Sequence, residues 1–207
     1  MPELPEVETT RSGIAPHITG QTITGTVIRQ PQLRWPIPKE LEQHLKGRKI
    51  RAVERRAKYL LIRLSHGTLI IHLGMSGSLR ILPRTTAPGK HDHFDLLFKT
   101  ICLRLHDPRR FGAVLWTEAP VDEHKLIMHL GPEPLSSEFT GDYLYQKAQG
   151  RSVAVKNLIM DGHVVVGVGN IYASEALFRC GIHPSRAANR ISAGRYAQLA
   201  EEIKQVL

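Results

Sequence analysis

The sequence contains few cysteines, with only Cys102 and Cys180 among 207 residues. Two thiols cannot supply a four-cysteine zinc site or a disulfide framework, so this usage fits a reducing cytoplasm. The sequence also lacks an apolar run close to the ~20 residues that a membrane span needs. It lacks the basic-then-apolar start of a secretory signal as well. We therefore expect a cytoplasmic protein with no membrane partner.

Acidic residues are in the minority. Asp and Glu number 19 against 28 Lys and Arg, which gives a formal net charge of +9. Such a surplus of positive charge is typical of proteins that bind polyanions, above all nucleic acids. On composition alone, a basic protein without a nucleic-acid partner stays an alternative.

The hydrophobic pattern changes along the chain, and the change predicts the fold class. Residues 4–18 fit one helix, with Pro5 in its first turn. Short β-type segments follow at 21–30, 49–56, 58–64, 67–74, 78–83, 93–98, 101–107 and 112–117. Helical patterns then cover roughly 121–130, 139–149, 152–161, 171–180 and 192–207. The sequence thus predicts an α+β protein, in which an N-terminal helix and an antiparallel β-sandwich or barrel precede an α-helical domain.

Composition also suggests where the domains meet. We expect an N-terminal domain over residues 1–118 and a C-terminal helical domain over residues 136–207. Residues 119–135 form the predicted linker region, which contains most of the stretch "LGPEPLSS".

The first residues, "MPELPEVETT", could carry covalent chemistry. Removal of Met1 would leave Pro2 as a secondary α-amine, which is far less basic than a lysine amine and so more nucleophilic near neutral pH. Such an amine can add to a sugar C1′ and form an iminium. A carboxyl group of Glu3 or Glu6 could move the protons. The plainer alternative is that these acids only favour the start of a helix.

The stretch 55–81 contains cations and an apolar residue on a turn. Lys58 flanks strand-like segments and could hold a phosphate. His72 lies in a mostly apolar strand, where a histidine satisfied within the core is the ordinary case. Met75 lies between Gly74 and Ser76, so it is either a core plug or a wedge that enters a base stack.

The stretch "HDPRRFGAVLW" places two arginines beside a phenylalanine. Arg109 could read base edges or phosphates, and Phe111 could intercalate. A solvated arginine pair beside a core phenylalanine is the alternative. The nearby "KHDHFD" offers His91, Asp92 and His93, but such a short run without partners elsewhere rarely binds a metal, and we expect no metal here.

The stretch "MDGHVVVGVGNIYASEALF" reads as a glycine turn that leads into a helix. We expect Asn170 to cap this helix, whose N-terminus would then suit a phosphate. "GVGNIY" does not complete the dinucleotide fingerprint and has no βαβ unit around it, so a dinucleotide fold is not expected.

Together these stretches closely resemble the bacterial formamidopyrimidine-DNA glycosylase family, whose members excise oxidised purines such as 8-oxoguanine in base-excision repair. The resemblance runs from Met1 to Leu207. It is carried by "MPELPEVET" (1–9), "RRAKYLL" (55–61), "IIHLGMSGSLRI" (70–81), "KHDHFDL" (90–96), "DPRRFGAVLW" (107–116), "HLGPEPL" (129–135) and "VVGVGNIYASEALF" (165–178).

The resemblance implies a role for each matching residue. Pro2 is the implied Schiff-base nucleophile of a glycosylase that is also an abasic-site (AP) lyase, Glu3 is the acid/base partner at the sugar, and Glu6 supports that pair. Lys58 and His72 hold phosphates near the lesion.

The remaining matching residues are implied to bind DNA. Met75, Arg109 and Phe111 fill the gap left by the flipped nucleotide, with Arg109 facing the orphaned cytosine. Lys156 and Asn170 grip the backbone. The implied fold is a β-sandwich followed by a helix–two-turn–helix domain. The implied partner is double-stranded DNA with oxidised bases or abasic sites, bound by a monomer in the bacterial cytoplasm at the nucleoid.

The sequence departs from the family at one point. The family ends in a four-cysteine zinc finger, whereas this chain stops at Leu207 within a predicted helix, and Cys102 and Cys180 are not those ligands. We therefore expect no metal or cofactor within these residues. A non-catalytic or lyase-only DNA-binding remnant remains an alternative. So does the endonuclease VIII branch, which prefers oxidised pyrimidines, although "PELPEV" and "DPRRFG" favour the purine branch.

Overall fold

A computed structural model describes residues 2–207, and its chain divides into two compact units, Met1–His124 and Lys125–Leu207. Each unit is described separately. Among the described residues, no helix combines the length and apolar character needed to cross a membrane.

The first unit begins with helix α1 (Leu4–Ile18), which has the bounds predicted from sequence. Pro5 lies in the first turn, where its missing N–H leaves no donor unsatisfied. Glu3 and Glu6 form a capping box, in which each side chain accepts a hydrogen bond from the backbone N–H of the other. Val7 and Ile14 lie on the buried stripe of the helix, so α1 packs against the β-structure through one face.

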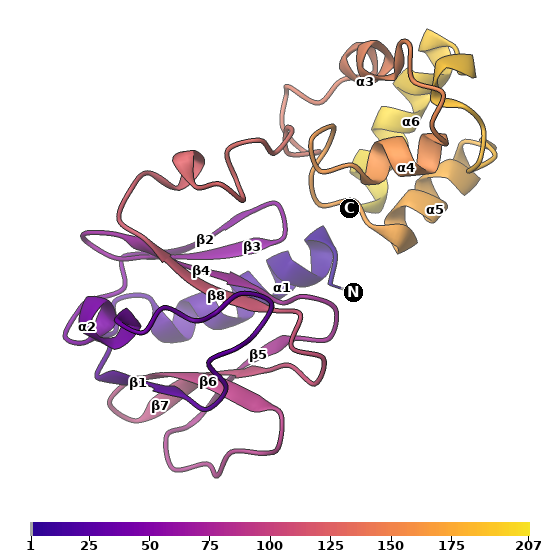
Figure 1. The fold of residues 1–207 in the computed structure, drawn as a ribbon. Coiled ribbons are helices and arrows are strands. Elements are labelled where there is room, and N and C mark those ends of the chain that lie inside the picture. Colours follow the sequence, from indigo (N-terminus) through magenta and orange to yellow (C-terminus); the bar gives the residue numbers. More distant parts are fainter. Residues whose placement is uncertain (1) are drawn as a thin grey trace. The chain divides into compact units, whose positions relative to one another are not determined.

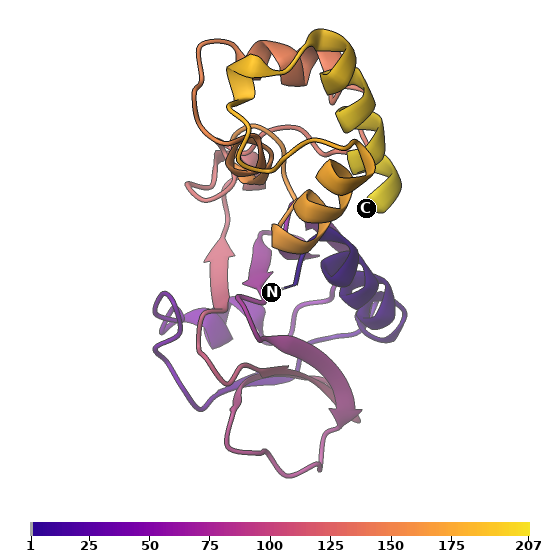
Figure 2. The same ribbon diagram turned by 90° about the vertical axis from the view of Figure 1, so that its right-hand side faces the viewer.

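Eight strands follow, one within or nearly matching each predicted β-segment. They are β1 (Gly25–Ile28), β2 (Ala52–Arg56), β3 (Tyr59–Arg63), β4 (Thr68–His72), β5 (Ser78–Pro83), β6 (Asp92–Leu97), β7 (Ile101–His106) and β8 (Ala113–Thr117). They form two antiparallel four-stranded sheets, in the orders β1-β6-β7-β5 and β2-β3-β4-β8. The two sheets form two layers of this unit (Figure 1; Figure 2), as the predicted sandwich requires.

The core of the first unit lies between these layers. It is formed by apolar side chains from both sheets and from α1, among them Ile14, Ile18, Leu60, Ile62, Leu69, Ile71, Phe94, Leu96, Leu103 and Leu105. Their alternation along each strand follows the two-residue period of a sheet with one buried face. A short helix, α2 (Leu41–Leu45), also packs here through two buried leucines; it is not among the elements predicted from the sequence.

The helix predicted at residues 121–130 is wrong. Only a 3-10 turn, η1 (Val121–Glu123), forms there, and turns follow it. The two buried side chains of this stretch are Val121 and Ile127. Residues six apart point in directions about 240° apart on an α-helix. One helix could not bury both on the same side, so the chain bends instead.

The second unit is helical. It contains α3 (Gly141–Ala148), α4 (Val155–Met160), α5 (Asn170–Arg179), the 3-10 turn η2 (Ala188–Arg190) and α6 (Ala193–Val206). The long helix α6, yellow in Figure 2, packs against α3 and α5. Buried side chains such as Leu158, Leu177 and Tyr196 close this second core. The prediction of an α+β chain with a C-terminal helical domain is confirmed.

Candidate active site

The start of α1 places a carboxyl group next to Pro2. Glu3 is only 1% exposed. Its backbone N–H donates a hydrogen bond of 2.8 Å to Oε2 of Glu6. Pro2 is partly buried. The capping box thus fixes the backbone just after Pro2 and keeps Glu3 out of bulk water.

Lys58 approaches this pair of acids from the turn between β2 and β3. Ala57 adopts a positive φ of 54° there, so the chain reverses sharply before Lys58. Burial lowers the pKa of Lys58, while the carboxylates of Glu3 and Glu6 oppose that shift. The charges of both carboxylates act on the Lys58 ammonium, which therefore lies near them. The fold thus brings Glu3, Glu6 and Lys58 to one site.

A second set of contacts ties α1 to the same turn. Oε2 of Glu8 accepts a 3.1 Å hydrogen bond from Nε of Arg55, whose Nη1 donates to the carbonyl of Ala57 at 2.9 Å. Arg11 donates to the other oxygen of Glu8 at 2.7 Å. The hydrogen bond from Arg11 is the largest of the causes that lower the pKa of Glu8. The network orients the helix so that Glu3 meets the β2–β3 turn.

His72 lies at the end of β4, opposite Tyr59 in the sheet register. Its Nδ1 accepts a 2.9 Å hydrogen bond from the backbone N–H of Gly74. Burial, and then the charges of Arg34 and Lys58, lower the pKa of His72 to about 4. The ring is therefore neutral at pH 7, and since Nδ1 is the acceptor, Nε2 carries the proton. A neutral Nε2–H can donate one hydrogen bond to an anion.

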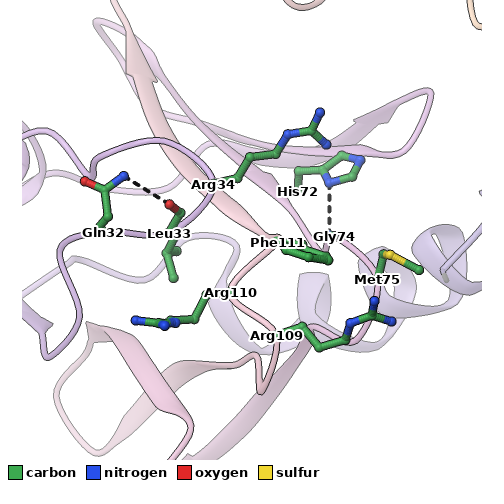
Figure 3. Close-up of a pocket in the computed structure, with 9 residues that line it drawn as sticks. All are labelled: Gln32, Leu33, Arg34, His72, Gly74, Met75, Arg109, Arg110 and Phe111. Carbon is green, nitrogen blue, oxygen red and sulfur yellow. Dashed lines mark hydrogen bonds between the residues drawn. The ribbon is translucent and has the colours of Figure 1, made fainter.

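A cavity of about 710 Å³ opens beside His72 (Figure 3). Its walls include Met75 and Phe111, which are 41% and 44% exposed. The guanidinium of Arg109 lies 5.1 Å from the centre of the Phe111 ring. Large apolar side chains that face solvent beside a cation mark a surface built for contact with another molecule.

The two loops that carry these residues are locked together. A Cβ on Gly74 would lie 2.4 Å from the carbonyl carbon of Phe111, so the loops approach closely because residue 74 lacks a side chain. Asp107 accepts hydrogen bonds from the Gly112 N–H at 2.8 Å and from the Ser76 hydroxyl at 2.9 Å. Met75 and Phe111 therefore project from one rigid double loop.

The second unit brings Lys156 and Asn170 together through a serine. Nζ of Lys156 donates to the hydroxyl of Ser174 at 2.8 Å, and that hydroxyl donates to the carbonyl of Asn170 at 2.8 Å. The expectation that Asn170 caps α5 is wrong, because Gly169 holds the extended cap conformation (φ −127°) and Asn170 is the first helical residue. Its side chain is exposed in the first turn, where backbone N–H groups point outward.

Of the predicted site residues, Glu3 and Glu6 form the capping box that follows Pro2, and the charges of both carboxylates act on Lys58. His72, Met75, Arg109 and Phe111 share the adjoining cavity, and the charge of Lys58 is felt at His72. Lys156 and Asn170 belong to the second unit.

Sequence reasoning missed Arg34, which lines the cavity and lowers the pKa of both His72 and Tyr59 by its charge. Burial nevertheless raises the pKa of Tyr59 overall. The only signal in the sequence was an arginine next to Trp35 in a proline-rich stretch, where the two side chains stack at 4.8 Å.

A β-sandwich that begins with a helix and holds a buried Glu3 beside Glu6 and Lys58, followed by a unit that matches the helix–two-turn–helix domain, defines a DNA glycosylase of base-excision repair. Sequence models of two domains match the chain. The "Formamidopyrimidine-DNA glycosylase N-terminal domain" matches residues 1–114, and the "Formamidopyrimidine-DNA glycosylase H2TH domain" matches residues 130–207. The chain belongs to the formamidopyrimidine-DNA glycosylase family.

Curated relatives and solved structures agree. Formamidopyrimidine-DNA glycosylases from Syntrophotalea carbinolica and Methylococcus capsulatus are 60% and 59% identical over the whole of this chain, which spans 77% of each relative. The Lactococcus lactis enzyme bound to DNA with an AP site has a TM-score of 0.93 at 30% identity, covering 98% of this chain and 79% of that one. Its complex with Fapy-dG DNA gives a TM-score of 0.92.

Proposed function

We propose that the acid–lysine cluster at the start of α1 performs the covalent chemistry of a bifunctional enzyme. The chain is a base-excision repair DNA glycosylase and AP lyase, and its substrate is duplex DNA with oxidised purines. The observation that carries the assignment of residues is the position of buried Glu3, directly after Pro2 and within the field of the Lys58 ammonium.

Pro2 is the nucleophile. Met1 lies outside the described residues, and its removal turns the Pro2 nitrogen into a secondary amine. This nitrogen attacks C1′ of the sugar, the bond from C1′ to the base breaks, and the base leaves with the amine proton. Glu3 then gives a proton to O4′ as the sugar ring opens, which leaves an iminium between Pro2 and C1′.

Strand cleavage follows from the iminium. The positive nitrogen makes the C2′ proton acidic, so the Glu3 carboxylate removes it and the C3′–O bond breaks (β-elimination). Loss of the C4′ proton and breakage of the C5′–O bond complete δ-elimination. Water then hydrolyses the iminium and releases the Pro2 amine.

The substrate must leave the helix before it reaches Pro2. An enzyme that reacts at C1′ of a stacked nucleotide has to flip it out, at a cost of a few kcal/mol. Met75, Arg109 and Phe111 fill the gap in the duplex, and the rigid double loop presents them without rearrangement. Arg109 faces the unpaired base, while Phe111 wedges beside it.

Phosphates are held by residues of both units. In the first unit, Lys58 offers a partly buried ammonium and His72 a neutral Nε2–H donor. In the second, Lys156 and Asn170 flank the N-terminus of α5, where helix N–H groups favour an anion. The net charge of +9 supports the same partner, double-stranded DNA. We further propose that the chain acts as a monomer in the bacterial cytoplasm.

The zinc finger that the family resemblance implies does not fit these residues. A four-thiolate site needs four cysteines, and this chain has two. Cys102 and Cys180 are both buried and belong to different units. Burial raises the pKa of each thiol, which disfavours the thiolate that zinc requires. No step of the proposed reaction uses that metal.

Borohydride trapping tests this assignment. The 207-residue chain is incubated with a duplex that has one abasic site, borohydride reduces the iminium to a stable amine, and peptide mass spectrometry locates the adduct. We expect it on the peptide that begins with Pro2. A matched control carries one extra residue ahead of Pro2, which leaves the nitrogen in a peptide bond and should abolish trapping. An adduct on Lys58 or Lys156 would contradict the proposal.

A further inference from the structure

A second cluster of titratable side chains lies in the first unit. One ligand atom from each of His44, His66 and Glu118 lies within 4.8 Å of the other two. Among residues 2–207, this is the only group of three or more His, Cys, Asp or Glu side chains with such spacing. The three come from α2, from the turn between β3 and β4, and from the residue after β8.

The cluster lies at the opposite end of its sheet from the proposed reaction. In the register of β4 and β8, Thr68 pairs with Thr117 beside the cluster, whereas His72 pairs with Ala113 at the other end. Four steps along β4 correspond to about 13 Å. Figure 1 likewise shows α2 on the far side of the first unit from the start of α1.

A tryptophan organises the two histidines. The His44 and His66 rings each lie 5.3 Å from the Trp116 ring, and His44 is stacked on it. The backbone N–H of Leu64 donates to the carbonyl of Gly67 at 2.9 Å, which closes the turn that carries His66. A Cβ on Gly67 would lie 2.4 Å from the Trp116 ring. Glycine at this position lets the turn press His66 against the indole.

One of the histidine nitrogens at this cluster has no hydrogen-bond partner among the described residues. Nδ1 of His44 lies 3.1 Å from Oε1 of Glu118. Nδ1 of His66 is buried and has no hydrogen-bond partner among residues 2–207. A buried nitrogen without a partner destabilises the fold and calls for an explanation, such as an ion. A cation bound through Nδ1 of His66 and shared with His44 and Glu118 would give this nitrogen a partner and would replace the simple His44–Glu118 contact.

We propose that His44, His66 and Glu118 bind one Zn²⁺ ion. Two imidazoles and a carboxylate form a ligand set that Zn²⁺ favours, whereas Mg²⁺ and Ca²⁺ favour all-oxygen sites. Bonds of about 2.1 Å in a tetrahedron place ligands about 3.4 Å apart. The Glu118 side chain is 58% exposed and can close on the ion, and water completes the fourth position.

The ion would have a structural role, as a cross-link between segments of the chain. It would connect α2 to the β3–β4 turn and to the end of β8, which are far apart in sequence. Because the ion binds the folded chain, it raises the free energy of unfolding. This role needs no thiol and does not depend on the reaction at Pro2.

Calorimetric titration of the metal-free 207-residue chain with ZnCl₂ tests the proposal. We expect saturable binding of one ion per chain and a higher melting temperature with Zn²⁺. Glu118→Gln should weaken the affinity at least about tenfold, and His66→Gln should abolish saturable binding. His17→Gln and Glu54→Gln, which alter exposed residues elsewhere in the unit, are the matched controls and should bind as the unchanged chain does.

A spectroscopic measurement locates the ion. Co²⁺ should give the visible absorption of a tetrahedral site and should quench the fluorescence of Trp116, measured in a Trp35→Phe background, and Zn²⁺ should reverse both effects. Because Glu118 is exposed, Glu118→Gln should stay folded, which circular dichroism would verify. Equal Zn²⁺ affinity in this variant and the unchanged chain, or no saturable binding by the unchanged chain, would overturn the proposal and leave an ordinary His–Glu contact.

Discussion

Nδ1 of His72 accepts the backbone N–H of Gly74 at 2.9 Å, so the hydrogen bond that shapes the turn also fixes the tautomer of the imidazole. Protonation of Nδ1 would destroy this bond. Burial, with the positive charges of Arg34 and Lys58, adds to the penalty and lowers the pKa of His72 to about 4. The His72 imidazole is thereby held neutral over the physiological pH range.

The first prediction concerns the titration of His72. We expect its ¹⁵N NMR signals to show the Nε2–H tautomer from pH 8 to pH 5 and to titrate only near pH 4, with His72→Gln identifying the signal. Because the folded pKa lies below the unfolded value of about 6.5, protons bind the unfolded chain more readily. This group therefore makes the fold less stable as the pH falls from about 6.5 towards 4. A titration midpoint near 6.5 would refute the tautomer assignment.

A buried ion pair in the sandwich gives the second prediction. Nε and Nη2 of Arg104 donate to the two carboxylate oxygens of Asp95 at 2.8 Å, and both side chains are buried. Burial alone would raise the pKa of Asp95, but hydrogen bonds from Arg29 and Arg104 outweigh it and lower that pKa. Asp95→Asn should lower the free energy of unfolding by about 3–5 kcal/mol, because it removes the buried carboxylate that binds Arg104 through two hydrogen bonds and leaves Asp92, at 3.6 Å, as the remaining counter-charge.

The same ion pair makes the free energy of unfolding depend on pH. A lowered carboxyl pKa contributes stability above the unfolded value of about 3.9, and that contribution is lost as the pH falls through the folded value. Urea unfolding of the unchanged chain and of Asp95→Asn at pH 7 and below pH 4 measures this. The difference in the free energy of unfolding between the two proteins should be smaller at the lower pH. An unchanged difference would mean that the charge of Asp95 does not provide the stability.

Much of the fold could be predicted because local signals and tertiary structure agree. Pro5 and the nearby acids mark the start of α1, and Gly, Pro and charged residues separate the strands. The prediction failed where the signal was weak. Helix α2 has only five residues, too few to show a period. Residues 121–130 have helical composition, but burial of Val121 and Ile127 on different sides requires a bend.

The candidate site was harder to predict because its members are distant in sequence. Glu3 and Lys58 come together only because α1 packs on β2 and β3. The residues themselves suggested a role for each, and only the family resemblance placed both near the same lesion. Arg34 has no motif around it. His44, His66 and Glu118 form a cluster only once the register of β3, β4 and β8 is known, which residue spacing does not reveal.

The third prediction separates the chemistry of Glu3 from its role in the helix cap. Glu3→Gln keeps a side-chain oxygen that accepts the Glu6 N–H but cannot transfer a proton. We expect single-turnover rates on 8-oxoguanine and abasic duplexes to fall about 10²–10⁴-fold, with little change in melting temperature. Glu54→Gln, on an exposed ion pair with Arg63, is the control. If Glu3→Gln instead lowers the melting temperature as the loss of a helix cap would, then Glu3 has a structural role.

The fourth prediction concerns the phosphate grip of the second unit. Lys156→Gln removes one cation beside the start of α5, so log Kd for undamaged duplex plotted against log salt should have a slope smaller by about 0.9. Affinity should weaken similarly for every sequence, since phosphate contacts do not read bases. Fluorescence anisotropy at several salt concentrations measures the slope. Lys204→Gln, which changes an ion-paired lysine near the end of α6, should leave the slope unchanged. Equal slopes in all three proteins would remove Lys156 from the interface.

The last prediction separates the wedge from the loop that presents it. Met75 projects from the double loop and is 41% exposed, so Met75→Ala should leave the melting temperature nearly unchanged. It should weaken binding to a duplex with a flipped lesion analogue, because an alanine cannot fill the gap in the base stack. Gly74→Ala should act differently. Its Cβ would lie 2.4 Å from the Phe111 carbonyl carbon, and the residue has a φ of +66°, so the loops must separate and the protein should be destabilised.

Two measurements distinguish these outcomes. Melting temperature should fall for Gly74→Ala and not for Met75→Ala. Fluorescence of a 2-aminopurine placed next to the lesion, which reports unstacking, should decrease for both variants. Gly150→Ala, which alters another glycine of positive φ that has no atom near the new Cβ, controls for backbone strain alone. If Met75→Ala leaves the 2-aminopurine signal intact, then Arg109 and Phe111 fill the gap in the duplex without Met75. Met75 would then not belong to the residues that fill it.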